Sequence, residues 1–182
     1  MSKPNSGHFK GTTGEKIASY KYLISQNHAI INGNKDDLRE HPCKYKQPGR
    51  KKLKMLQEKL EARTITKEEY KLLSWSKRLA KRRNRGIDEF WKEERRRIKK
   101  GLPTTRNWSA QQRADILNKK RPKFKGKTIQ SHHTYSVAKY PHLANKGKYI
   151  QPVTPYEHLY GYHGGNYKNS LPGKPINDIK EF

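Results

Sequence analysis

At 182 residues, the chain has room for one domain of ordinary size, or for a small domain joined to a helical or extended arm. Hydrophobic residues make up 31% and charged residues 32% of the sequence, so any core must be small. The 42 Lys and Arg residues against 16 Asp and Glu give a formal net charge of +26, which favours a polyanionic partner, first of all nucleic acid, over a basic surface that is merely solvated.

Cysteine content and apolar runs exclude further classes of protein. Cys43 is the only cysteine, so the chain can form neither an intrachain disulfide nor a Cys-rich zinc site. A bound metal would therefore rest on His, Asn or carboxylate side chains. No N-terminal run has the pattern of a signal peptide, and no apolar run approaches the roughly 20 residues that span a bilayer. We expect no membrane-spanning segment, which leaves open that the chain is one piece of a larger exported protein.

The first 101 residues predict an arm followed by helices. Residues 1–50 contain scattered Gly, Pro, Asn and Lys, which is typical of an arm or linker. In residues 51–101, apolar side chains recur at helical spacing, which predicts a segment of two or three basic helices. Thr66 followed by Glu69 is a capping-box pattern, and Asn-Arg-Gly at 84–86 predicts a break before the next helix. The basic runs either lie along a phosphate backbone or form a solvated helix face.

The next predicted feature is a domain boundary. Gly-Leu-Pro at residues 101–103 ends the helical segment, which assigns residues 102–182 to a separate C-terminal domain. Within that domain, Ser109 and Gln112 form a second cap pattern and predict a short helix at 110–117.

The C-terminal domain is predicted to have the order strand, strand, helix. A short strand at 126–133 is flanked by turn residues, and a second strand is expected at 149–153. Thr154-Pro155 predicts the start of a helix, because Pro suits the first helical position. We therefore predict an α+β fold: a small ββα domain, preceded by basic helices and an extended N-terminal arm.

Histidines are concentrated in this predicted ββα region, where five of the eight occupy positions 132, 133, 142, 158 and 163. Neutral imidazole binds divalent transition metals and can also accept a proton near neutral pH. Because adjacent strand residues point to opposite faces, His132 and His133 cannot easily bind one ion together, but one can hold a metal while the other deprotonates water. The five-residue spacing of His158 and His163 fits a single face of an α-helix less well than a spacing of four.

Several short motifs of this region together resemble a known family. They are Lys-Arg-Pro-Lys, Ile-Gln-x-His-His, Tyr-Pro-His-Leu-Ala, Pro-Val-Thr-x-x-Glu-His and His-Gly-Gly-Asn-Tyr. From Trp108 to Pro175 the chain resembles the C-terminal nuclease domains of bacterial polymorphic toxins, with an HNH or endonuclease VII-like (GHH-type, ββα-metal, His-Me finger) fold. Many members of that family have Gly before the paired histidines, where this chain has another small residue, Ser131.

The resemblance implies roles for individual residues. His132 would be a metal ligand and His133 the general base, with His158 and His163 completing the metal site. Asn166 would orient either the base or the finger loop. The site would hold one divalent ion, and three imidazoles favour Zn, Ni or Mn over Mg.

The activity that the resemblance implies is metal-dependent hydrolysis of DNA phosphodiester bonds with little sequence specificity. Basic residues would hold the backbone without reading the bases. Those expected to contact nucleic acid are Lys119, Lys120, Arg121, Lys123, Lys125 and Lys127. Two alternatives stay open: a ribonuclease toxin, and a non-catalytic nucleic-acid-binding module whose histidines hold a structural metal.

The same resemblance implies a biological setting. The chain would be the C-terminal toxin domain of a secreted bacterial effector, delivered as part of a larger polypeptide and active in the cytoplasm of the target cell. An acidic immunity protein would be its cognate partner. Within the histidine cluster, His142 is expected to be structural, and the tyrosines of this region are expected to form the core and rim of a small domain rather than a base-stacking platform.

Overall fold

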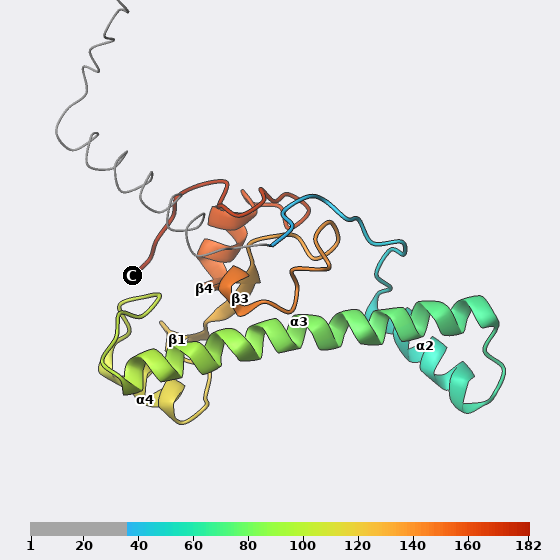
Figure 1. The fold of residues 1–182 in the computed structure, drawn as a ribbon, viewed down its shortest axis with the longest axis horizontal. Coiled ribbons are helices and arrows are strands. Elements are labelled where there is room, and N and C mark those ends of the chain that lie inside the picture. The colour runs from blue at the N-terminus through green and yellow to red at the C-terminus, as the bar shows by residue number, and fades with distance from the viewer. Residues whose placement is uncertain (1–35) are drawn as a thin grey trace, which may run out of the picture. The chain divides into compact units, whose positions relative to one another are not determined.

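The computed structural model describes residues 36–182, of which residues 38–182 form one compact unit (Figure 1). Most of the predicted arm at 1–50 lies outside the described residues. No helix within the described range combines the length and the apolar character needed to cross a membrane.

Two helices form an antiparallel pair at the start of the described chain. Helix α2 (Arg50–Glu61) packs against the first part of α3 (Lys67–Lys99), which runs along one side of the unit (Figure 1). The predicted capping box is confirmed: the Thr66 hydroxyl accepts a hydrogen bond from the Glu69 backbone N–H, and the Glu69 carboxylate accepts one from the Thr66 N–H.

The predicted break at residues 84–86 is wrong, because α3 continues through it without interruption. Gly86 is buried, and a Cβ atom there would lie 2.4 Å from the carbonyl oxygen of Ala144. The glycine therefore allows a distant loop to approach the helix backbone closely, and the long, capped helix tolerates its lower helix propensity.

Short strands follow helix α4 (Ala110–Leu117), whose predicted Ser109–Gln112 capping box is confirmed. The predicted strand at 126–133 is instead divided between two hairpins. Strand β1 (Lys123–Phe124) pairs with β2 (Lys127–Thr128), and β3 (Gln130–His133) pairs with β4 (Ile150–Val153) in antiparallel register.

A helical turn from Glu157 to Tyr162 follows β4 and completes the predicted strand, strand, helix order, so the fold is α+β. This turn has π-helical rather than α-helical hydrogen bonding.

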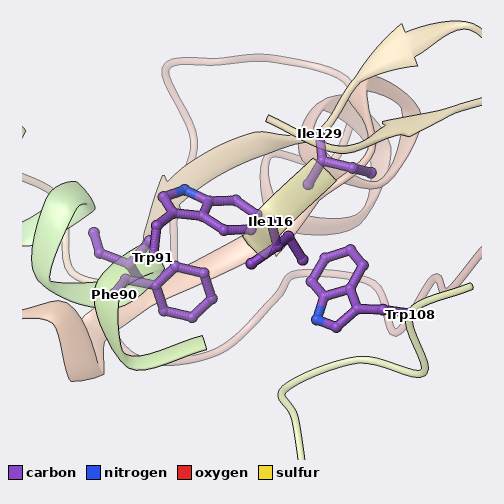
Figure 2. Packing of buried hydrophobic residues seen from close by; sticks show 6 residues of the cluster. Phe90, Trp91, Trp108, Ile116 and Ile129 are labelled. Atoms are coloured by element: carbon purple, nitrogen blue, oxygen red, sulfur yellow. The ribbon is translucent and has the colours of Figure 1, made fainter. Parts of the chain in front are cut away.

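The hydrophobic core joins α3 to the C-terminal part of the chain (Figure 2). Its buried members are Phe90, Trp91, Trp108, Ile116, Ile129 and Ile150. Beside it, the Glu94 carboxylate is 1% exposed and accepts hydrogen bonds from the Trp108 indole and from Thr105. The core draws on residues from both sides of the expected boundary at 102, and the division into segments 51–101 and 102–182 stays a prediction.

Candidate metal centre and general base

Strand β3 presents its side chains alternately to two sides, as the pleat of a strand requires. Gln130 and His132 lie on the side of the π-helical turn, where each contacts His158. Ser131 and His133 lie on the other side: Ser131 is hydrogen-bonded to a residue of α3, and His133 to the loop that packs on α3. The two adjacent histidines are thus separated into different environments.

Three histidines from β3 and the π-helical turn converge on one point. The possible ligand nitrogens of His132, His158 and His163 all lie within 4.8 Å of one another. His132 is buried and the other two rings are half-buried, with ring centroids 4.9 to 5.1 Å apart. These are the three residues that the sequence predicts as metal ligands, and their role in binding stays a prediction.

Hydrogen bonds to the outer ring nitrogens fix the tautomers of two of these histidines. Nδ1 of His158 lies 2.5 Å from the Oε1 of Gln130, and Nδ1 of His163 lies 2.5 Å from the carbonyl oxygen of Asn169. Both partners are acceptors, so both Nδ1 atoms carry the proton and both Nε2 atoms present a lone pair.

These two Nε2 atoms face each other at 3.2 Å. Two lone pairs at this distance repel unless a cation lies between them. Two nitrogens bound tetrahedrally to one zinc ion at about 2.0–2.1 Å would be about 3.3 Å apart. The donors present therefore suit a divalent metal, with outer hydrogen bonds of the kind that orient metal-bound imidazoles.

The π-helical turn explains how a five-residue spacing brings two ligands together. The N–H of His163 donates to the carbonyl of His158 at 3.2 Å, five residues earlier, in place of the four-residue hydrogen bond of an α-helix. Residues five apart consequently fall on nearly the same face of the turn. The expected mismatch applies to an α-helix and is absent here.

Burial favours the neutral form of His132 and His158. Burial first, and then the neighbouring histidines His158, His163 and His133, lower the pKa of His132 to about 3. Burial is also the main reason that the pKa of His158 falls to about 4. Uncharged rings near pH 7 have lone pairs available for a metal ion.

His133 is arranged differently, as a proton acceptor requires. Its Nε2 donates to the carbonyl oxygen of Ala144 at 3.0 Å, which leaves Nδ1 without a proton. Burial lowers the pKa of His133, the hydrogen bond to Ala144 opposes this shift, and the charge of Arg83 adds to it. The imidazole is therefore neutral at pH 7 and able to accept a proton from water.

Helix α3 holds the loop that supplies this carbonyl. The Arg82 guanidinium donates to the carbonyl oxygens of Pro141 and His142 and to the Oδ1 of Asn145. Because Gly86 lacks a side chain, the backbone around Ala144 can lie directly on the helix. The position of His133 thus depends on Arg82 and Gly86 of α3, which are far from it in the sequence.

Asn166 lies in the turn after His163 and is exposed. Its side-chain oxygen accepts from the Lys168 N–H, and its carbonyl accepts from the Asn169 N–H. Among the described residues it has no hydrogen bond to His133; it lies in the same turn as Asn169, whose carbonyl is the partner of His163, and its own orienting role stays a prediction. His142 packs edge-on against His41, away from the metal cluster.

The six basic residues expected to bind nucleic acid are exposed on the β1–β2 hairpin and on the turn before it. One of them, Arg121, also has a side chain that is held in place by two contacts. Its Nη1 donates to the hydroxyl of Ser131, and its guanidinium lies 4.9 Å from the centre of the Trp91 ring. Lys125 lies 3.6 Å from a carboxylate oxygen of Glu181. The exposed residues are Lys119, Lys120, Arg121, Lys123, Lys125 and Lys127.

Sequence reasoning missed the groups that orient the histidines. Gln130 could have been found, because strand alternation places it on the same side as His132. The carbonyls of Ala144 and Asn169 cannot be recognised from the sequence, since every residue has a backbone carbonyl. The contribution of α3 is hidden in the sequence, because the pattern around Gly86 favours a helix break there.

Comparison with known proteins identifies part of the chain. Residues 73–154 match the family described as GHH signature containing HNH/Endo VII superfamily nuclease toxin. The match begins within α3, and it ends before His158 and His163. No curated protein and no solved structure gave a significant match. Residues 73–154, a range that includes Ser131-His132-His133, therefore resemble a nuclease toxin domain of the HNH/Endo VII superfamily.

Proposed function

We propose that this nuclease toxin domain is a metal-dependent endonuclease that hydrolyses DNA with little sequence specificity. The observation that carries the proposal is the pairing of two sites on one strand. A cluster of three imidazoles suits a divalent ion, and beside it His133 has its Nε2 bound to Ala144 and its Nδ1 free of a proton. Phosphodiester hydrolysis requires both functions.

In the proposed reaction, Nδ1 of His133 accepts a proton from the attacking water, and the new oxygen–phosphorus bond forms as the bond to the leaving 3′ oxygen breaks. His132, His158 and His163 would hold one divalent ion, which supplies positive charge for the scissile phosphate and the leaving oxygen. Three nitrogen ligands favour Zn, Ni or Mn over Mg. Gln130 keeps His158 in the tautomer that can bind the ion.

The positive charge supports a nucleic-acid substrate that is bound with little recognition of its base sequence. A net charge of +26 attracts a phosphate backbone, and Lys and Arg side chains contact phosphates in any sequence. We expect cleavage to be inhibited by salt and to show no strong site preference.

The family also supports a biological setting. As a nuclease toxin, the domain would be delivered into a target bacterial cell as the C-terminal part of a secreted effector, and would act in the cytoplasm. The basic surface would suit an acidic immunity protein as its cognate inhibitor.

The decisive experiment incubates the protein with plasmid DNA and with RNA, in the presence of Mg, Mn, Ni or Zn and then with chelator. We expect DNA cleavage that chelator abolishes and that His133→Ala slows by at least about 100-fold. His41→Ala is the matched control, because His41 is exposed and lies outside the cluster.

Intact DNA with all four ions would refute the DNase proposal, and RNA cleavage alone would indicate a ribonuclease. If His133→Ala cuts as fast as the unmodified protein, the assignment of the general base is wrong.

A further inference from the structure

Ser131 directly precedes the His132-His133 pair, where a Gly-His-His sequence would have glycine. Its hydroxyl oxygen accepts one hydrogen bond from the Trp91 indole at 2.9 Å and another from the Arg121 guanidinium at 3.2 Å. Both lone pairs are therefore used, and the hydroxyl proton has no acceptor among residues 36–182. A glycine here could make none of these contacts.

Arg121 is held by a hydroxyl and an aromatic ring rather than by an ion pair. Its guanidinium lies 4.9 Å from the centre of the Trp91 ring, and only one of its five N–H groups is hydrogen-bonded within the described part of the chain. No carboxylate of those residues forms an ion pair with it. Burial is the main cause that lowers the pKa of Arg121; the charge of Asp88 opposes the shift and that of Arg95 adds to it.

A small cavity of about 180 Å³ lies beside this guanidinium. Four basic side chains and one carboxylate line it, with Trp91 as the remaining wall: Asp88, Trp91, Arg95, Lys119, Lys120 and Arg121. The turn after α4 fixes the backbone from which the two lysine side chains extend, because the backbone N–H groups of Lys119 and Lys120 donate to the carbonyls of Ile116 and Asp115. The cavity is thus rich in donors and positive charge, a chemistry that suits the oxygens of a phosphodiester.

The cavity is also close to the proposed reaction centre. Ser131 and His133 lie on the same side of β3, two residues apart, which corresponds to about 6.5 Å along a strand. One nucleic-acid strand could therefore contact Arg121 and His133 at once.

We infer that Arg121, oriented by Ser131 and Trp91 and joined by Arg95, Lys119 and Lys120, binds a non-scissile phosphodiester of the DNA substrate. This inference rests on the proposed function, since it assigns a subsite to that substrate. The hydroxyl of Ser131 gives this chain a guanidinium of fixed orientation that glycine at this position could not provide.

The test measures binding of a labelled DNA duplex by fluorescence anisotropy, in chelator, between 50 and 200 mM salt. Loss of one phosphate contact lowers by about 0.9 the slope of the logarithm of the binding constant against the logarithm of the salt concentration. Between 50 and 200 mM salt, the unmodified protein should therefore lose about 3.5-fold more affinity than Arg121→Gln does. Arg50→Gln, an exposed arginine at the start of α2, is the matched control and should keep the full slope. Equal slopes for Arg121→Gln and Arg50→Gln would overturn the inference.

A second variant tests the orienting role of the hydroxyl. With Ser131→Gly, whose folding is checked by thermal unfolding, we expect KM for DNA to rise severalfold while kcat stays within about twofold, as for loss of uniform binding. A fall in kcat at constant KM would instead show that the hydroxyl serves the catalytic histidines, and would overturn its role in the subsite.

The two proposals fail separately. Binding in chelator does not need cleavage, so an Arg121-dependent salt slope in a protein that cuts no DNA refutes only the nuclease mechanism. If the protein cleaves DNA but the salt dependence of binding is the same with and without Arg121, only the subsite is refuted.

Discussion

At the scale of single residues, two adjacent histidines have different environments because their outer partners differ. His132 faces two other imidazoles, whereas His133 donates to a backbone carbonyl. Both residues are histidine, so residue type alone does not distinguish their roles. A hydrogen bond to one ring nitrogen decides which nitrogen keeps a lone pair, and so what the ring can do.

Gln130 offers a direct test of this dependence. Removing its amide with Gln130→Ala takes the acceptor from Nδ1 of His158, so the ring loses both its fixed tautomer and its fixed orientation. We expect the affinity for Zn or Ni to fall about 10- to 100-fold, measured by isothermal titration calorimetry. Gln111→Ala, on an exposed face of α4, should bind the metal as the unmodified protein does. Unchanged affinity in Gln130→Ala would argue against an orienting role.

At the scale of secondary-structure elements, the form of the helix after β4 and the continuity of α3 both matter for the site. The π-helical turn aligns His158 with His163. Helix α3 supports the loop that carries Ala144, and Gly86 sets how closely the loop approaches. Each feature departs from what local sequence patterns favour, because tertiary contacts outweigh helix propensity.

Gly86→Ala tests the close approach. On an exposed helix this change would stabilise by up to about 1 kcal/mol, but here the new Cβ would lie 2.4 Å from the Ala144 oxygen. We expect the loop to shift, the free energy of unfolding to fall by about 1–3 kcal/mol, and kcat to fall at least about tenfold as His133 loses its partner.

Gly49→Ala is the matched control, because no atom lies within 4 Å of the added Cβ. It should leave kcat unchanged. A Gly86→Ala enzyme that is more stable and fully active would show that the approach of the loop is unimportant.

At the scale of the whole molecule, the core and its buried polar groups hold the C-terminal part of the chain against α3. Glu94 on α3 accepts hydrogen bonds from Trp108 and Thr105 across the base of this core. Arg106 pairs with Glu157 at 2.6 Å and also donates to the carbonyl of the C-terminal Phe182. The Glu94 contacts cross the predicted boundary, and those of Arg106 join parts of the chain that follow it.

Glu94→Ala should reveal this coupling. It leaves the buried Trp108 indole N–H without its acceptor, so we expect the free energy of unfolding to fall by about 3 kcal/mol in a chemical denaturation experiment. Glu93→Ala is the neighbouring control: its ion pairs with Arg96 and Arg97 are 37% to 48% exposed, and its removal should change stability by less than about 1 kcal/mol. Similar values for the two variants would contradict the proposed role of Glu94.

The sequence by itself determined the α+β class, both capping boxes, the strand, strand, helix order and the set of histidines that converge. The first three follow from local patterns, namely side-chain periodicity and cap spacing, which need no knowledge of distant contacts, whereas the set of histidines follows from the resemblance to a known family.

Only the tertiary structure decided which group orients each ring. The Ala144 carbonyl, the close approach at Gly86, the π-helical turn and the Trp91–Ser131–Arg121 contact all depend on segments far apart in sequence. Every residue has a backbone carbonyl, and glycine can either end a helix or lie inside one, so residue type does not predict these features. Long-range packing, rather than residue type, selects between these outcomes.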